Sequence, residues 1–171
     1  MKAYRLPTSA AAVLAVLALV APPAPAANAA PDPATDAAIE KGVAWLVAKQ
    51  AEDGSFSNPQ FPGLSGLALW AVAASGNPAC SNVVRKGADY ILSKAQADGG
   101  IYTPIPGRKG GGLATYNTAV CLTALAATGR DDITDVVLAA RAFLAEAQHL
   151  GDDVFKGGFG YDKQTDRPYT D

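Results

Sequence analysis

The chain alternates between two kinds of helical segment. In the segments at about 36–50, 82–95 and 133–148, apolar residues recur every three or four positions among charged ones, which is the pattern of a helix with one buried face. The segments at about 64–75 and 116–128 contain apolar and small residues and no charged residue. A helix that is apolar on every side is expected to be buried on every side. No period-two pattern extends beyond a few residues, so the sequence predicts an all-α protein of about five helices.

Capping and turn residues separate these segments. Asp36 is the predicted N-cap of the first helix, and the Glu-Asp-Gly sequence at 52–54 predicts the turn after it. Gly76 and Gly129 follow the two charge-free segments as C-terminal caps. The alternation predicts two layers, in which amphipathic helices face water and enclose the charge-free helices.

Internal repeats relate the segments to one another. Residues 41–49 align without a gap on residues 86–94 at an offset of 45, and the match continues from Asp53-Gly54 to Asp98-Gly99. The second segment aligns on the fourth at an offset of 53, which pairs Gly76 with Gly129. A third copy of the amphipathic unit runs from Ala142 to Tyr161. Such self-similarity is typical of architectures built from repeated helix pairs.

Each copy ends with a glutamine, a glycine and an aromatic residue. The glutamines are Gln50, Gln96 and Gln148, and the aromatics are Phe56, Tyr102 and either Phe159 or Tyr161. A glutamine at the end of a helix can bond the backbone groups that the helix leaves unsatisfied. The glycine permits a sharp turn, and the aromatic ring can pack over it. The pattern therefore predicts a structural role for the three glutamines.

The pattern Lys-Gly-x-x-aromatic-Leu, followed by Gln, Gly and an aromatic, resembles the QW-type repeat of squalene–hopene cyclases and protein prenyltransferases. The resemblance covers about residues 36–171, although this chain has Phe, Ile or Tyr where the consensus favours Trp. Those families fold as an α/α toroid, in which inner and outer helices alternate around a ring. The resemblance implies a partial α/α toroid here, with fewer helices than a closed ring. Either the sequence is a fragment or copies of the chain associate to complete a ring; we expect a fragment.

The first 30 residues have the pattern of a signal peptide. Lys2 and Arg5 precede an apolar run at 10–21, and Ala27-Asn28-Ala29 forms a small-residue cleavage pattern. The run is shorter than the roughly 20 residues of a membrane span, and the alternative is an uncleaved anchor. We therefore expect an exported protein with a signal peptide at 1–30, a flexible leader at 31–35 and a repeat domain at 36–171, without a stable membrane span after cleavage.

The net charge limits the partners that the sequence predicts, and the positions of the two cysteines predict their surroundings. Residues 1–30 hold two basic and no acidic residues, so the remainder carries 12 basic and 16 acidic residues, a net charge of −4. Without a basic block, binding to nucleic acid has no electrostatic support. Cys121 lies in an apolar run and is predicted to be a core residue, whereas Cys80 is expected in a loop. Whether the two pair stays open, because spacing alone cannot place their Cα atoms.

The sequence offers no catalytic motif of the families it resembles. The cyclases use an Asp-x-Asp-Asp acid motif, which is absent; the acid pairs at 131–132 and 152–153 flank helix ends, where capping and dipole effects explain them. The prenyltransferases hold zinc with Asp, Cys and His, but His149 is the single histidine and neither cysteine is near it in sequence. A nucleophile–base pair is likewise unsupported. We expect no metal and no cofactor. The glycine-rich stretch at 108–112 lacks the ending of a phosphate loop and is interpreted as a loop.

The resemblance also implies where a ligand would bind. In toroids the ends of inner helices line a central pocket, and by this resemblance Trp70, Tyr116 and Asn117 are candidate ligand-binding residues. Aromatic rings there could stack on an isoprenoid or stabilise a cation. The alternatives are core packing for Trp70 and a cap of the helix N-terminus for Asn117.

Two functions remain open at this point. The first is an isoprenoid-handling protein of the cyclase and prenyltransferase kind, whose catalytic residues would lie beyond Asp171. The second is a non-catalytic module that binds a ligand or a protein outside the cytoplasm. Export favours the second, and self-association becomes possible if the chain is complete.

Overall fold

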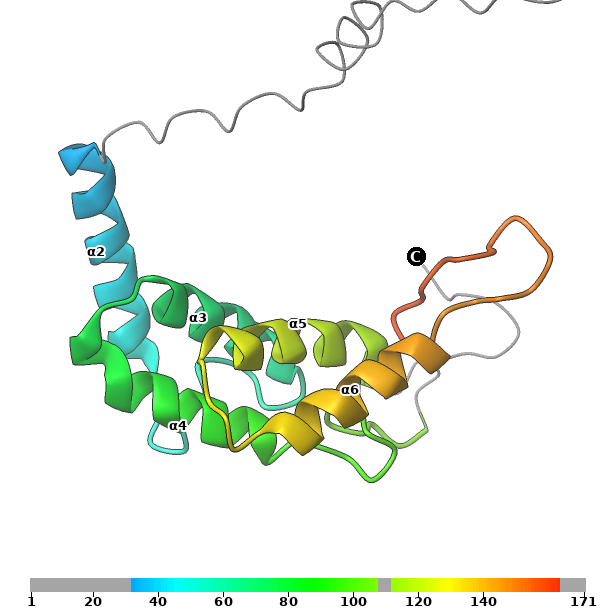
Figure 1. Ribbon diagram of the computed structural model, residues 1–171. Helices are drawn as coiled ribbons and strands as arrows, with labels where there is room; N and C mark the ends of the chain where they lie inside the picture. The colour runs from blue at the N-terminus through cyan, green and yellow to red at the C-terminus, as the bar shows by residue number, and fades with distance from the viewer. Residues whose placement is uncertain (1–31, 108–111, 164–171) are drawn as a thin grey trace, which may run out of the picture. The chain divides into compact units, whose positions relative to one another are not determined.

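The computed structural model describes residues 32–107 and 112–163, and this part of the chain is helical (Figure 1). It contains no β-strand and only two isolated bridges, Ala95–Ile101 and Gln148–Phe159. The helices are α2 (Pro33–Lys49), α3 (Pro62–Ala74), the 3-10 turn η2 (Pro78–Cys80), α4 (Ser81–Leu92), α5 (Ala114–Ala127) and α6 (Thr134–Glu146). The all-α prediction is confirmed. The expected signal peptide at 1–30 and residues 108–111 of the glycine-rich stretch lie outside the described residues.

The first helix begins earlier than predicted. The Asp32 carboxylate accepts hydrogen bonds from the Ala34 amide and the Thr35 hydroxyl, so Asp32 rather than Asp36 caps α2. Pro33 occupies the first helical position, where its missing amide hydrogen costs nothing. Residues 33–35 of the expected leader are therefore part of α2. The chain divides after Ala38 into two compact units, and the described part of the first unit is this initial stretch of α2.

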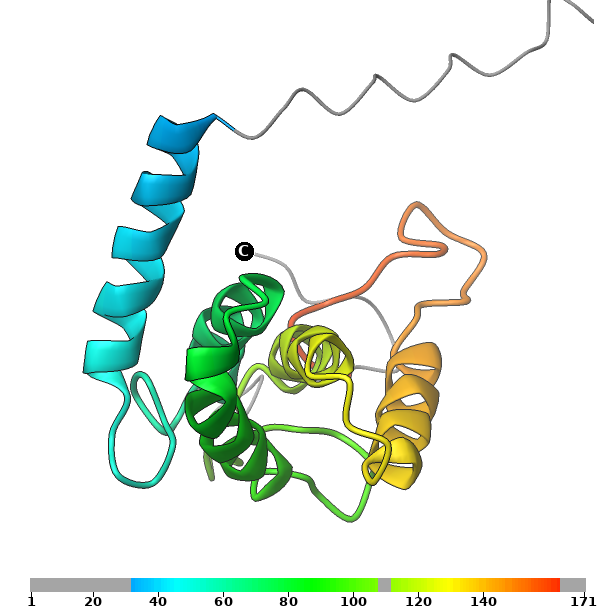
Figure 2. The same ribbon diagram turned by 60° about the vertical axis from the view of Figure 1, so that its left-hand side comes forward.

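Helices α3 and α5 form the centre of the second unit, and glycines let them approach closely. The Gly63 amide donates a 2.8 Å hydrogen bond to the Asn117 Oδ1 atom, and a Cβ atom on Gly63 would lie 2.7 Å from that oxygen. A Cβ atom on Gly66 would lie 3.2 Å from Val120 on α5. Helix α4 packs against α3, and α6 packs against α5 (Figures 1 and 2). We call α3 and α5 the central helices, and α4 and α6 the flanking helices.

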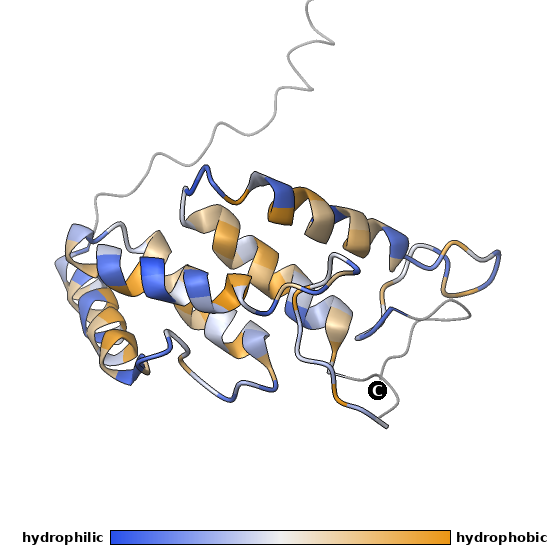
Figure 3. Ribbon diagram, turned by 90° about the horizontal axis from the view of Figure 1, so that it is seen from below, coloured by the Kyte–Doolittle hydropathy of each residue, from blue (hydrophilic) through white to orange (hydrophobic). Residues whose placement is uncertain are grey.

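The core lies where the central and flanking helices meet. Leu69 of α3, Ile91 of α4, Leu125 of α5 and Ala140 of α6 are fully buried in one cluster. A smaller cluster joins Val43 of α2 to Val72 and Cys80. The central helices are mostly hydrophobic, whereas hydrophilic residues run along α4 (Figure 3). This division agrees with the alternation of helix types predicted from the sequence.

The prediction that the charge-free helices are buried on every side is wrong. Leu64, Leu67 and Trp70 of α3 are 40%, 43% and 45% exposed, and Tyr116 of α5 is 38% exposed. The physical reason is that neighbouring helices cover only part of the circumference of each central helix.

One hydrogen bond recurs between each loop and the central helix that follows it. The Phe56 amide donates to the Ser65 hydroxyl at 3.0 Å, and the Ile101 amide donates to the Thr118 hydroxyl at 2.8 Å. Phe56 and Ile101 are related by the offset of 45, and Ser65 and Thr118 by the offset of 53. The two repeats found in the sequence therefore correspond to one repeated structural contact.

The turn register corrects two residues of the repeat, because Gln96 and Tyr102 each lie one position beyond the equivalents of Gln50 and Phe56. Backbone hydrogen bonds of 2.8–2.9 Å close the turn in all three copies; they run from Ala51 to Ser55, from Gln96 to Gly100 and from His149 to Gly158. The residues that follow these turns are Phe56, Ile101 and Phe159. Tyr102, which the sequence suggested as the second aromatic of the series, lies one position further along because the hydrogen-bond register sets the equivalence.

The three glutamines have the predicted structural role. The Gln50 amide group donates to the carbonyls of Gly54 and Val83 at 3.2 and 2.9 Å. Gln96 donates to two backbone carbonyls at 2.9 Å, and Gln148 donates to the Gly157 carbonyl at the same distance. Each side chain thus satisfies carbonyl groups around its turn.

In the described part of the chain, no helix is both long enough and apolar enough to cross a membrane.

Candidate binding site

An apolar groove of about 530 Å³ lies along the first half of α5. Its walls are α5, the flanking helix α6 and the segment 159–161 that follows the third turn. The lining residues are Thr115, Tyr116, Ala119, Leu144, Phe159, Gly160 and Tyr161. Three of these side chains are aromatic and none is charged, which is the composition expected of a site for an apolar partner.

Tyr161 fixes the end of the groove through its backbone. Its carbonyl accepts hydrogen bonds from the amides of Thr115 and Tyr116 at 3.0 and 3.3 Å. These amides belong to the first turn of α5, where no carbonyl of the helix can reach them. The rings of Tyr116 and Tyr161 then meet edge to face, with centroids 6.3 Å apart.

Thr115 adds one buried polar group beside the groove. The residue is 4% exposed, and its hydroxyl has no hydrogen-bond partner among the described residues. A buried hydroxyl without a partner is uncommon, because leaving it unpaired costs about 1–3 kcal/mol. The apolar groove therefore has a buried, unpaired hydroxyl next to its wall.

The structure separates the three candidate ligand residues. Tyr116 lines the groove, but Trp70 lies on the exposed face of α3 and is not among the groove residues. Asn117 is fully buried, and its amide nitrogen donates to the carbonyls of Gly112 and Leu113 at 2.6 and 3.2 Å. Together with its bond from the Gly63 amide, these contacts give Asn117 a structural role. Ligand contact by Trp70 and Asn117 stays a prediction.

Six of the seven groove residues were not identified from the sequence as site residues: Thr115, Ala119, Leu144, Phe159, Gly160 and Tyr161. The third Gly-aromatic motif was the available signal for Phe159 and Tyr161. The motif locates the turn, but it does not reveal that the turn folds back onto the start of α5.

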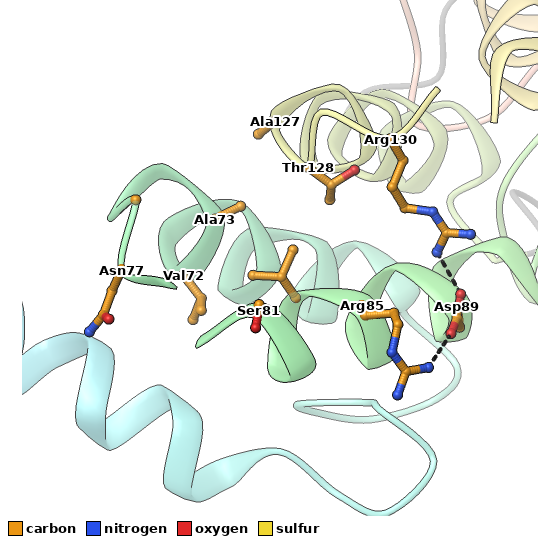
Figure 4. Close-up of a pocket in the computed structure, with 11 residues that line it drawn as sticks. Val72, Ala73, Asn77, Ser81, Arg85, Asp89, Ala127, Thr128 and Arg130 are labelled. Atoms are coloured by element: carbon orange, nitrogen blue, oxygen red, sulfur yellow. Dashed lines mark hydrogen bonds and ion pairs between the residues drawn. The ribbon is translucent and has the colours of Figure 1, made fainter. Parts of the chain in front are cut away.

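A second hollow of about 560 Å³ lies where α3 and α5 end beside α4 (Figure 4). Its floor includes Val72 and Val84, and its rim includes Arg85, Asp89 and Arg130. The charges on the rim are paired with one another. The Asp89 carboxylate bonds Arg130 at 2.6 Å and Arg85 at 3.3 Å.

Arg130 also bonds Asp132 through two nitrogen atoms, at 2.9 and 2.7 Å. The hydrogen bonds from Asp132 and Asp89 raise the pKa of the Arg130 guanidinium, and the same contact lowers the pKa of Asp132. Because its charged groups are already paired, this rim acts as a staple between α4 and the start of α6, and we do not treat the hollow as the binding site.

His149 is held by the turn that follows α6. Its ring is buried, and its Nε2 atom lies 3.0 and 3.1 Å from the two oxygens of the Asp153 carboxylate. The Phe155 amide donates to the same carboxylate at 2.8 Å. The Phe155 amide and, more weakly, His149 lower the pKa of Asp153. Asp153 thus organises the 149–158 turn, which is a structural use of an acid near a helix end.

The described residues hold neither a candidate metal centre nor a disulfide. Residues 32–107 and 112–163 contain no group of three or more His, Cys, Asp or Glu side chains that could hold a metal ion. Cys80 and Cys121 are both free and buried. Cys121 lies in the core as predicted, whereas Cys80 belongs to η2 and to the smaller cluster rather than to an open loop.

Comparison of the chain with protein-family models, with curated proteins and with solved structures finds no match.

Proposed function

We propose that this protein is an exported, non-catalytic binding module with a partial α/α toroid fold, which holds an apolar partner in the groove beside α5. The observation that supports this most directly is the groove itself, lined by Tyr116, Phe159 and Tyr161 without any charged side chain. The recurring bonds Phe56–Ser65 and Ile101–Thr118 support the repeat architecture, because one contact is built twice by equivalent residues.

The resemblance to squalene–hopene cyclases and prenyltransferases suggests an isoprenoid as the small-molecule candidate. Edge-to-face rings such as Tyr116 and Tyr161 offer faces and edges against which an unsaturated hydrocarbon chain can pack. The proposal assigns no reaction, since the seven lining residues include no carboxylate, histidine or cysteine that could protonate or attack a substrate.

Binding to the groove can be tested with the full chain and an isoprenoid alcohol such as farnesol. An environment-sensitive dye reports on the exposed apolar surface, and farnesol should displace it. Ala119→Glu places a charge in the groove wall and should abolish displacement, because a carboxylate is poorly tolerated against an apolar partner. Thr123→Glu, one turn further along the exposed side of α5, is the matched control and should bind as the unchanged chain does.

Export is tested separately by the intact mass of the protein recovered outside the cell. Cleavage after the Ala27-Asn28-Ala29 pattern should remove the first 29 or so residues. Retention of the full N-terminus in the membrane fraction would contradict the proposed signal peptide.

A further inference from the structure

We propose that the groove is a docking slot for one further helix hairpin of defined chemistry: a charge-free helix with a Ser or Thr hydroxyl near its start, followed by a flanking helix. This inference rests on the proposed function, since it names the partner that the apolar groove would hold. Three features of the repeat support it: within the described residues, the loop-to-helix bond and the turn glycine each have two occupied copies and one open copy, and the packing side of the central helix has one occupied and one open copy.

The first feature is the loop-to-helix hydrogen bond. Phe56 and Ile101 each donate an amide hydrogen to a hydroxyl on the next central helix, Ser65 or Thr118. Phe159 is the equivalent residue of the third copy, and its amide finds no acceptor among the described residues. Its side chain is 47% exposed, whereas Ile101 is fully buried. The third copy thus has the amide donor and the apolar side chain of Phe159. The described residues include no further central helix that accepts this hydrogen bond.

The second feature is the side of α5 that faces the groove. On α3, Gly63 and Gly66 form the side against which α5 packs. The offset of 53 makes Tyr116 and Ala119 their equivalents on α5, and both line the groove. Among the described residues, helix α5 therefore presents to the groove the same side that α3 uses to hold a neighbouring central helix, and Tyr116 on this side is 38% exposed.

The third feature is the glycine of each turn. A Cβ atom on Gly54 would collide with the Lys86 carbonyl of α4, and one on Gly99 would lie 2.8 Å from the Ala139 carbonyl of α6. These two turns therefore pack tightly against the backbone of the next flanking helix. Gly157 occupies the third position, and the nearest atom to its Cβ site is the Gln148 Nε2 at 3.9 Å. Space for the backbone of a further flanking helix is open there.

These features define the chemistry of the partner. The contact with Tyr116, Ala119 and Phe159 requires a helix without charge on its facing side, as in other helix-in-groove complexes. The Phe159 amide requires a hydroxyl acceptor, and Gly157 requires a second helix that follows the first. The protein's own α5–α6 hairpin, residues 113–149, has all of these features and is the natural probe.

The test measures binding of a fluorescent peptide of residues 113–149 to the full chain by anisotropy. We expect saturable binding that Ala119→Glu abolishes. Thr123→Glu is the control for an added charge one turn beyond the groove lining, where its equivalent on α3, Trp70, stays 45% exposed although α5 packs against α3. Thr118→Val in the peptide removes the hydroxyl that would accept the Phe159 amide and should weaken binding roughly three- to tenfold. If the Thr118→Val peptide binds as tightly as the unchanged peptide, the proposed register is overturned.

A second measurement does not require the free peptide to be folded. The hairpin is fused after Asp171 through a flexible linker, which gives it a high effective concentration at the slot. Docking should slow hydrogen exchange of the Phe159 amide at least tenfold relative to the unfused chain. The fused hairpin carries the Thr118 hydroxyl. If the Phe159 amide nevertheless exchanges at the same rate in the fused and unfused chains, the proposal is overturned.

The remaining outcomes distinguish this inference from the proposed function. If farnesol binds the groove and neither the free nor the fused hairpin docks, the helical partner is wrong and the apolar binding function stands. If the unchanged chain associates with itself and Ala119→Glu prevents this, the hairpin of a second copy fills the slot, and the helical occupant is supported. If neither farnesol nor the hairpin binds, both proposals fail.

Discussion

The amide of Ile101 donates a 2.8 Å hydrogen bond to the hydroxyl of Thr118, seventeen residues further along the chain. Both residues are fully buried, and the Thr118 hydroxyl itself donates to the Ala114 carbonyl at 2.7 Å. This bond ties the second turn to the central helix α5, just as the Phe56–Ser65 bond ties the first turn to α3. The repeat therefore depends on one hydroxyl at a defined position of each central helix.

Replacing Thr118 with Val should test that dependence. The valine keeps the shape of the side chain but leaves the Ile101 amide buried without an acceptor, which costs about 1–3 kcal/mol of unfolding free energy. The midpoint of urea denaturation measures the loss. Thr123→Val is the control, because Thr123 is exposed and its hydroxyl bonds only the Ala119 carbonyl of its own helix. Equal midpoints for the two variants would show that the Ile101–Thr118 bond does not hold the turn.

Asn117 makes a second testable link between the central helices. Its side chain accepts from the Gly63 amide and donates to the carbonyls of Gly112 and Leu113, all within the core. Asn117→Ala leaves the Gly63 amide and the Gly112 carbonyl without this partner, whereas the Leu113 carbonyl keeps its bond from the backbone amide of residue 117. The change should lower the unfolding free energy by at least about 2 kcal/mol. Denaturation with urea measures the effect, and Asn82→Ala on the exposed side of α4 should change stability by less than about 0.5 kcal/mol. A loss at Asn117 no larger than at Asn82 would contradict the structural role.

The helices and the repeat could be predicted from the sequence because each leaves a local signal. Glycines, charges and apolar spacing placed α3 to α6 within a few residues of their observed bounds. The prediction of Tyr102 as the second aromatic of the repeat was wrong, because the hydrogen bonds of the turn make Ile101 the equivalent of Phe56.

The groove could not be predicted, because it depends on a long-range backbone contact. The Tyr161 carbonyl reaches the amides of Thr115 and Tyr116, and nothing in the spacing of these residues encodes that approach. The exposed side of α3 was missed for a related reason. Composition shows that Leu64 and Leu67 are apolar, but only the arrangement of neighbouring helices decides which sides of α3 are covered.

Both cysteines should be unreactive in the folded protein. Burial raises the pKa of the Cys121 thiol to about 12, so little of the reactive thiolate forms near neutral pH. Cys80 is also buried. Ellman's reagent should therefore react slowly with the native chain and quickly with both thiols after denaturation in urea. Fast reaction in the native state would contradict the burial, and no reaction after denaturation without reductant would reveal a disulfide in place of the two free thiols.

Tyr102 should make the protein sensitive to alkaline pH. Burial raises the pKa of its phenol to about 12, and the hydrogen bond from the phenol to the Asp98 carboxylate, 2.8 Å long, acts in the same direction. The unfolded chain loses this proton near pH 10. Because the folded-state pKa is the higher one, the stabilisation by Tyr102 is complete below about pH 10 and is lost as the pH rises towards 12.

The comparison of the unchanged chain with Tyr102→Phe isolates this contribution, because the other tyrosines and the lysines titrate in both proteins. Urea midpoints measured at about pH 9 and about pH 11.5 should fall more steeply for the unchanged chain than for Tyr102→Phe, which has no phenol to ionise. Asp98→Asn is the companion variant: it keeps an acceptor for the Tyr102 hydroxyl and removes the negative charge that opposes phenolate formation. The decline in Asp98→Asn should therefore be intermediate, and the same slope in all three proteins would show that the Tyr102–Asp98 contact does not control the alkaline transition.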